Sequence, residues 1–125
     1  MARILIVDDS PIQIAGMRRI VEALGHEVSI AEDGASGVER AKRDLPDLIL
    51  MDVVMPNLNG FQATRMISRE ATTKHIPIVM VTTKDQDTDR VWGMRQGAKA
   101  YINKPIKEPE LVAIIRQMLG EGVAT

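Results

Sequence analysis

Short apolar runs alternate with segments of helical periodicity along the whole chain. The runs are mostly aliphatic, with many β-branched residues, and they predict strands that are buried on both faces, at 4–7, 28–31, 48–51, 78–81 and 100–102. After each run, apolar residues recur at the spacing of one helix face. In the first such segment these residues are Met17, Ile20, Val21 and Leu24, and in the last they are Leu111, Ile114, Ile115 and Met118.

The ends of these helices are marked by residues with known terminal preferences. Ser10 is a candidate N-cap of the first helix, Pro11 suits its first turn, and Gly25 ends it. The second helix must end before Pro46, and Gly97 closes the fourth. The three middle helices are marked by Ala35, Val38 and Ala41, by Ala63, Thr64, Ile67 and Ala71, and by residues 91–95.

This strict alternation of strand and helix predicts an α/β fold, a doubly wound parallel sheet with helices on both faces. Five strands in 125 residues favour the flavodoxin-like strand order 2-1-3-4-5. The chain contains no linker, repeat or low-complexity segment, so we expect residues 1–125 to form one domain. Ligands of such folds bind beyond the carboxyl ends of the strands, between strands 1 and 3.

Composition narrows the classes of function. The 16 Lys and Arg against 17 Asp and Glu provide no basic footprint for nucleic acid. One Trp, one Tyr and one Phe argue against base-stacking platforms and aromatic cofactor pockets. The absence of Cys excludes disulfides and thiolate metal sites, and no stretch approaches a membrane span or a secretory signal. We therefore expect a small soluble domain in the cytoplasm.

Polar residues follow four of the predicted strands. Asp8 and Asp9 follow the first, Asp52 the third, Thr82 the fourth and Lys104 the fifth. Each residue alone has an ordinary structural explanation, as a helix cap, a turn residue or a solvated lysine. Together, three converging carboxylates repel one another unless a cation compensates their charge. Oxygen ligands without His or Cys suit Mg²⁺.

Lys104 and Thr82 add the charge and the hydrogen bond that a metal-bridged phosphoryl group requires. The chemistry predicted for this set is attack by a carboxylate oxygen on phosphorus, which produces an aspartyl phosphate.

These residues resemble the motifs of a known family. The chain is similar, over essentially its whole length, to the receiver domain of two-component response regulators, the CheY-like fold. The matching motifs are Asp8-Asp9, Asp52-x-x-Met55-Pro56, Val81-Thr82 and Tyr101-x-x-Lys104-Pro105. Within the family it most resembles the single-domain receivers of type IV pilus (twitching motility) chemosensory systems, the PilH type. The stretches that carry this closer match are 55–65, 82–86, Val91-Trp92-Gly93 and 95–98.

The resemblance implies a role for each matched position in the acidic site. Asp52 would accept a phosphoryl group from a histidine kinase. Asp9, Asp52 and the backbone carbonyl of Val54 would hold Mg²⁺, and Asp8 would assist through a bound water. Lys104 would pair with the phosphoryl oxygens, aimed by a cis peptide bond before Pro105.

The resemblance also implies a switch and a partner surface. Thr82 would bind the phosphoryl group and draw its loop inward. The side chain of Tyr101 would then move into the space that the loop vacates. Helix 4, strand 5 and helix 5 would then present Trp92, Tyr101 and Lys107 to an effector protein of the motility machinery. For Trp92 the alternative is ordinary packing. We expect a CheA-like kinase as the donor, a monomer or weak dimer, no output domain, and no catalysis beyond self-phosphorylation and self-dephosphorylation.

Two positions depart from the best-known chemotaxis receivers. Val54 stands where Asn is frequent, and Lys84 stands where an acidic side chain is frequent. Both flank the path of the water that hydrolyses an acyl phosphate. We therefore expect an altered lifetime of the phosphorylated form.

Other functions compete with this interpretation. Phosphohydrolases of related folds usually need Asp-x-Asp and a cap domain, whereas Asp8 and Asp9 are adjacent and no residues remain for a cap. A nucleotide- or flavin-binding module would need a Gly-rich phosphate loop, which the sequence lacks. A docking module that works without phosphorylation and a phosphate sink for a shared kinase both stay open.

Overall fold

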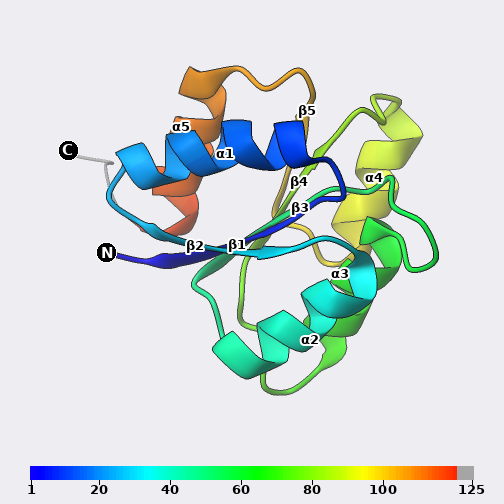
Figure 1. The fold of residues 1–125 in the computed structure, drawn as a ribbon. Helices are drawn as coiled ribbons and strands as arrows, with labels where there is room; N and C mark the ends of the chain where they lie inside the picture. Colours follow the sequence, from blue (N-terminus) through cyan, green and yellow to red (C-terminus); the bar gives the residue numbers. More distant parts are fainter. Residues whose placement is uncertain (121–125) are drawn as a thin grey trace.

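The computed structural model describes residues 1–120, which form a five-stranded sheet between two layers of helices (Figure 1). All neighbouring strands are parallel, in the order β2-β1-β3-β4-β5, so the predicted fold and strand order are confirmed. The elements in chain order are β1 (Arg3–Val7), α1 (Pro11–Ala23), β2 (Glu27–Ala31), α2 (Gly34–Asp44), β3 (Leu48–Met51), α3 (Gly60–Arg69), β4 (Ile78–Thr82), α4 (Asp87–Gln96), β5 (Ala100–Asn103) and α5 (Glu108–Met118).

Each face of the sheet has its own apolar core. Successive side chains of a strand point to opposite faces. Ile4 and Ile6 of β1 accordingly pack with α1 and α5, whereas Leu5 and Val7 pack with α2 and α3. A third, smaller cluster joins Met80 of β4 to residues near α4. Figure 1 shows α1 and α5 on one side and α2, α3 and α4 on the other. Burial on both faces explains why the central strands are apolar throughout.

Two helices begin at side-chain caps, and the cap at Ser10 confirms the predicted start of the first helix. The Ser10 hydroxyl accepts a hydrogen bond from the backbone N–H of Gln13, and Pro11 begins α1. At α3, Asn59 and Gln62 form a reciprocal capping box. The sequence therefore specifies where these two helices begin.

Two positions expected on buried helix faces are exposed instead. Ala71 lies beyond α3, which ends at Arg69 because the hydroxyl of Thr73 donates to the carbonyl of Ile67 and closes the last turn. Ala35 points outward, since the buried face of α2 is made by its other small residues, Gly34, Gly37, Val38 and Ala41.

The chain has 8 methionines, and only some of them lie in the core. Met17, Met51, Met55 and Met80 are buried, but Met66 on α3 and Met94 on α4 are exposed.

Among residues 1–120, no helix has both the length and the apolar content that a membrane crossing requires.

Candidate functional site

The carboxyl ends of β1 and β3 bring three carboxylates together. Val7 and Met51 are register partners on these adjacent strands, so the residues that follow them, Asp8 and Asp52, lie next to each other. One carboxylate oxygen each from Asp8, Asp9 and Asp52 lies within 4.8 Å of the others. Asp8 and Asp52 are buried, with exposed fractions of 0% and 6%, whereas Asp9 faces solvent. The predicted convergence of these side chains is therefore present in the structure.

Lys104 reaches these carboxylates from the end of β5. Its ammonium donates to Asp8 Oδ2 at 2.7 Å and lies 3.6 Å from Asp52 Oδ1. The Lys104 side chain is 7% exposed, so the ion pairs are shielded from water. The Lys104–Pro105 peptide bond is cis, as expected.

The surroundings of Asp52 disfavour its charge on balance. Burial raises the pKa of the Asp52 carboxyl, the Lys104 ammonium acts to lower that pKa, and the charge of Asp8 raises it further. The backbone N–H of Val53 donates to Asp52 Oδ1 at 2.8 Å, which holds the carboxylate in place. The negative charges of three carboxylates exceed the one positive charge of Lys104, so a further cation would stabilise the group.

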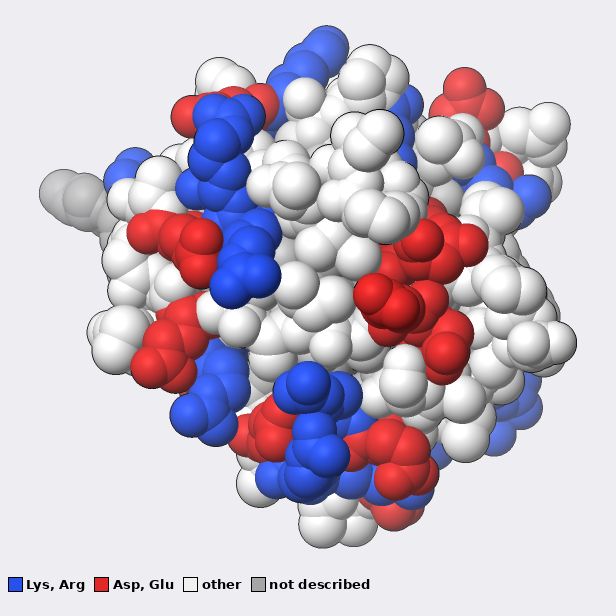
Figure 2. Space-filling model, in the orientation of Figure 1, with Lys and Arg blue, Asp and Glu red and all other residues white. Residues whose placement is uncertain are grey.

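The donor set fits Mg²⁺. All three side chains offer hard oxygen ligands, which this ion prefers, and no softer nitrogen or sulfur ligand lies among them. Mg²⁺ binds its ligands at roughly 2.0–2.1 Å, so two ligand oxygens of one ion lie at most about 4.2 Å apart. The carboxylates are close to this spacing. Acidic side chains also gather over the carboxyl ends of β1 and β2 (Figure 2), where Asp9, Glu32 and Asp33 are exposed.

Thr82 and Lys84 occupy the opposite side of the site, after β4. Thr82 is fully buried, and its hydroxyl oxygen accepts a hydrogen bond from the backbone N–H of Lys84 at 3.2 Å. The Lys84 ammonium lies 3.9 Å from Asp89 Oδ1, at the start of α4. Lys84 and the half-exposed Val54 both line a hollow of about 250 Å³, together with Val53, Met55, Asn59 and Phe61.

Tyr101 is buried, with an exposed fraction of 5%, although we expected it on the partner surface. Its ring packs with Val53 and Met80, and its hydroxyl donates to the carbonyl of Lys84 at 2.8 Å. Burial is the main cause that raises the pKa of Tyr101 to about 12. In this conformation, therefore, the tyrosine offers a partner almost no surface.

The other two expected surface residues are accessible. Trp92 is 47% exposed and Lys107 is exposed. The guanidinium of Arg90 lies over the Tyr101 ring, 5.1 Å from its centre. Residues two apart on a helix do not face each other, so Trp92 leaves α4 on a different side from Arg90.

Three residues around Tyr101 were not identified from the sequence. Arg90 donates to the backbone carbonyl of Tyr101, and Asn103 donates to the carbonyl of Lys84. At Gly93, an added Cβ would lie 3.2 Å from two ring carbons of Tyr101, so glycine makes room for the ring. Asn103 and Gly93 lie inside stretches that match the family, but their contacts with the Lys84 carbonyl and the Tyr101 ring join separate elements and leave no pattern in the sequence.

Comparison with known proteins agrees with the geometry. The family model of the response regulator receiver domain matches residues 4–116. The chain is 53% identical over 119 residues to Protein PilH of Pseudomonas aeruginosa, a match that covers 95% of this chain and 98% of that one. It is 41% identical over 117 residues to the response regulator PleD of Caulobacter vibrioides, but there it spans only 26% of the relative.

Solved structures share the whole fold. The receiver domain of a sensor histidine kinase from Pseudomonas aeruginosa, with a magnesium ion coordinated in its active-site cleft, superposes with a TM-score of 0.88 at 32% identity, over 96% of this chain and 98% of that one. The Vibrio cholerae chemotaxis protein CheY4 superposes with a TM-score of 0.89 at 29% identity, over 95% and 99% of the two chains. The chain therefore belongs to the response regulator receiver domain family.

Proposed function

We propose that this chain is a stand-alone response regulator that accepts a phosphoryl group on Asp52 from a histidine kinase, with Mg²⁺ bound beside it. The observation that carries the proposal is the meeting of Asp8, Asp9 and Asp52 with the buried ammonium of Lys104. The likeness to a receiver domain whose cleft holds magnesium supports the choice of metal.

The contacts of Asp52 support different roles for its two oxygens in this proposal. The N–H of Val53 and the ammonium of Lys104 both lie against Oδ1, which leaves Oδ2 to attack phosphorus. In transfer from a kinase histidine, the bond from Oδ2 to phosphorus forms as the phosphorus–nitrogen bond breaks, and the imidazole leaves with the electron pair. Bound Mg²⁺ supplies positive charge to the phosphoryl oxygens.

Lys104 and Thr82 stabilise the transferred group in this proposal. The ammonium of Lys104 can pair with a phosphoryl oxygen because it already lies between Asp8 and Asp52. The Thr82 hydroxyl accepts from Lys84, so its own proton is available to a phosphoryl oxygen. Val54, which directly follows the Asp52–Val53 pair, would add its backbone carbonyl to the metal ligands.

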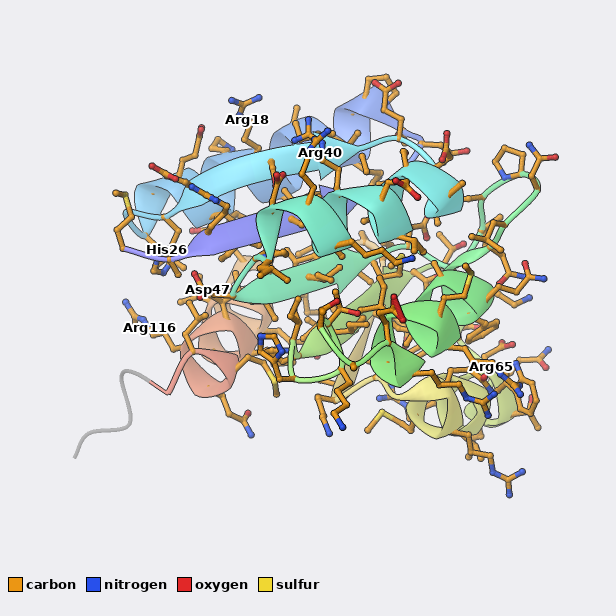
Figure 3. The ribbon with its side chains drawn as sticks, turned by 90° about the horizontal axis from the view of Figure 1, so that it is seen from below. Arg18, His26, Arg40, Asp47, Arg65 and Arg116 are labelled. Atoms are coloured by element: carbon orange, nitrogen blue, oxygen red, sulfur yellow. The ribbon has the colours of Figure 1, made fainter. Side chains whose placement is uncertain are left out.

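An acyl-phosphate experiment tests the proposal. With Mg²⁺ and acetyl phosphate, we expect intact mass spectrometry to detect one added phosphoryl group on the wild type and none on Asp52→Asn. Asp47→Asn is the matched control, because Asp47 is exposed and lies at the other end of β3 (Figure 3). An adduct that persists in Asp52→Asn, or that forms equally well after chelation of Mg²⁺, would contradict the mechanism.

The resemblance to PilH supports a more specific setting. In that setting a CheA-like kinase is the donor, and the face of α4, β5 and α5 controls an effector of type IV pilus twitching motility or chemotaxis. The receiver then acts as a single domain in the cytoplasm, as a monomer or weak dimer. Phosphotransfer from purified pilus and flagellar CheA-like kinases tests the setting, and we expect faster transfer from the pilus kinase.

A further inference from the structure

The side chain of Asn103 makes two hydrogen bonds to the backbone next to the candidate site. Asn103 is the last residue of β5 and directly precedes Lys104. Its amide nitrogen donates to the backbone carbonyl of Lys84 at 2.9 Å and to that of Thr82 at 3.3 Å. One side chain therefore binds the loop after β4 on both sides of Thr83.

These bonds continue the pairing of β4 and β5 beyond the end of the sheet. The last register pair of the two strands is Thr82 with Asn103. Past that pair, the N–H of Lys104 donates to the Thr82 carbonyl at 2.9 Å. The Asn103 amide then reaches one step further, to the Lys84 carbonyl, which also accepts from the Tyr101 hydroxyl. Beyond the last register pair, the Asn103 amide and the Tyr101 hydroxyl are the side-chain donors that bind the Lys84 carbonyl to β5.

The same contacts determine where the Thr82 hydroxyl lies relative to Lys104. The N–H of Lys84 holds that hydroxyl at 3.2 Å, and Asn103 holds the carbonyl of Lys84. The hydroxyl and the ammonium must converge on one phosphoryl group, and errors of about 1 Å in such placement reduce function strongly.

We propose that Asn103 is a positioning residue for phosphoryl binding, because its amide holds the Thr82 loop in register with Lys104. The inference rests on the proposed function of the site. The hydrogen bonds of the Asn103 amide go to the carbonyls of Thr82 and Lys84 and not to the carboxylates, so we expect its effect to be specific to the phosphoryl group and to leave the binding of Mg²⁺ alone unchanged.

Calorimetric titration separates the two steps. We would titrate each protein with Mg²⁺ alone, and then with beryllium fluoride, a phosphoryl mimic, at saturating Mg²⁺. Asn103→Leu has a similar size but no N–H donor, and Asn103→Ala is the second variant. For both, we expect Mg²⁺ affinity within about twofold of the wild type and beryllium fluoride affinity reduced about thirtyfold, the effect of two hydrogen bonds of ordinary strength.

Tyr101→Phe is the matched control, because it removes the other side-chain donor to the Lys84 carbonyl and leaves the Thr82 carbonyl fully bonded. Its beryllium fluoride affinity is expected to fall less, by about fivefold, the effect of one hydrogen bond. Serine at position 103, in Asn103→Ser, retains a short donor and should recover part of the loss.

Three results would overturn the inference. These are an unchanged beryllium fluoride affinity in both Asn103 variants, an equal loss of Mg²⁺ affinity, and failure of both variants to fold, which would make the amide a general folding element. A wild-type protein that binds Mg²⁺ but not beryllium fluoride would instead contradict the proposed function.

Discussion

The two halves of the site are held in different ways. In the acidic half, Asp8 and Asp52 extend two adjacent buried strands, and Gly60 lies so close to the backbone of Asp52 that an added Cβ would clash with it. In the other half, which we call the switch half after the proposed role of Thr82, the segment 83–88 is exposed and side-chain bonds from Tyr101 and Asn103 hold its Lys84 carbonyl.

A ligand therefore affects the two halves differently. The acidic half is preorganised by packing, so ion binding requires little rearrangement there. Each hydrogen bond of the switch half contributes about 1 kcal/mol, so a phosphoryl group that binds one arrangement better by a few kcal/mol can shift the loop and α4. The exposed apolar side chains Val91, Trp92 and Met94 on α4 would move with it.

The substitution with the greatest predicted effect on stability removes the positive charge of the acidic half. Lys104→Ala leaves buried Asp8 and Asp52 without their ammonium, and removal of one partner of a buried pair typically costs about 3–5 kcal/mol. We expect a loss of this size in urea unfolding without divalent ions, and partial recovery with Mg²⁺, which binds only the folded carboxylates. Lys99→Ala, at an exposed lysine, is the control. A loss that Mg²⁺ does not reduce would contradict the expected metal site.

The next effect overpacks the switch half. In Gly93→Ala the new Cβ would lie 2.9 Å from Met80 Sδ and 3.2 Å from the Tyr101 ring, which should cost about 1–3 kcal/mol. The same substitution at Gly16 of α1 meets no atom within 4 Å and should be neutral or stabilising by about 0.5–1 kcal/mol. Unfolding curves of the two variants measure the difference, and Mg²⁺ affinity should be unchanged in both. Equal stabilities of the two variants would show that α4 can shift to accommodate the methyl group added at position 93.

A smaller effect concerns the phenol of Tyr101. Tyr101→Phe loses the bond to the Lys84 carbonyl and should be about 1 kcal/mol less stable than the wild type. Because the pKa of Tyr101 is raised to about 12, the folded protein keeps this proton after the unfolded chain has released it. The resulting stabilisation is therefore complete below the ordinary pKa near 10 and is lost as the pH rises from there to about 12.

The near-ultraviolet absorbance of tyrosinate measures this titration directly, because Tyr101 is the only tyrosine of the chain. Protein unfolded in urea provides the reference, with a transition near the ordinary pKa. A folded protein that titrates at the same pH as the unfolded one would place the phenol in water.

The smallest expected effect lies between the halves, at Val54. This side chain is half-exposed at the hollow beside Asp52, and the Lys84 ammonium is drawn toward Asp89 rather than across the opening. Val54→Asn adds an amide that can orient water, so we expect autodephosphorylation to become several-fold faster, a change below the roughly 1.4 kcal/mol of a tenfold rate difference. Loss of the phosphoryl mass over time measures the rate. An unchanged rate would show that position 54 does not act on this water.

Sequence periodicity predicted most of the fold because burial on both faces leaves a continuous apolar run, which is visible without any tertiary contact. Deviations occurred where a local contact overrides the pattern. The hydroxyl of Thr73 binds the carbonyl of Ile67, so α3 ends before Ala71. In α2 the buried face includes Gly34 and Gly37, and Ala35 lies on the exposed face.

The acidic site follows from the sequence alone, since residues that directly follow parallel strands meet at one edge of the sheet. The order of strands along the chain is therefore sufficient to bring together Asp8, Asp9, Asp52 and Lys104. The arrangement of the switch half could not be predicted without the three-dimensional contacts. The burial of Tyr101 and the bonds of Asn103 depend on how far α4 approaches β5 and on the path of an exposed loop, and neither leaves a periodic signal in the chain.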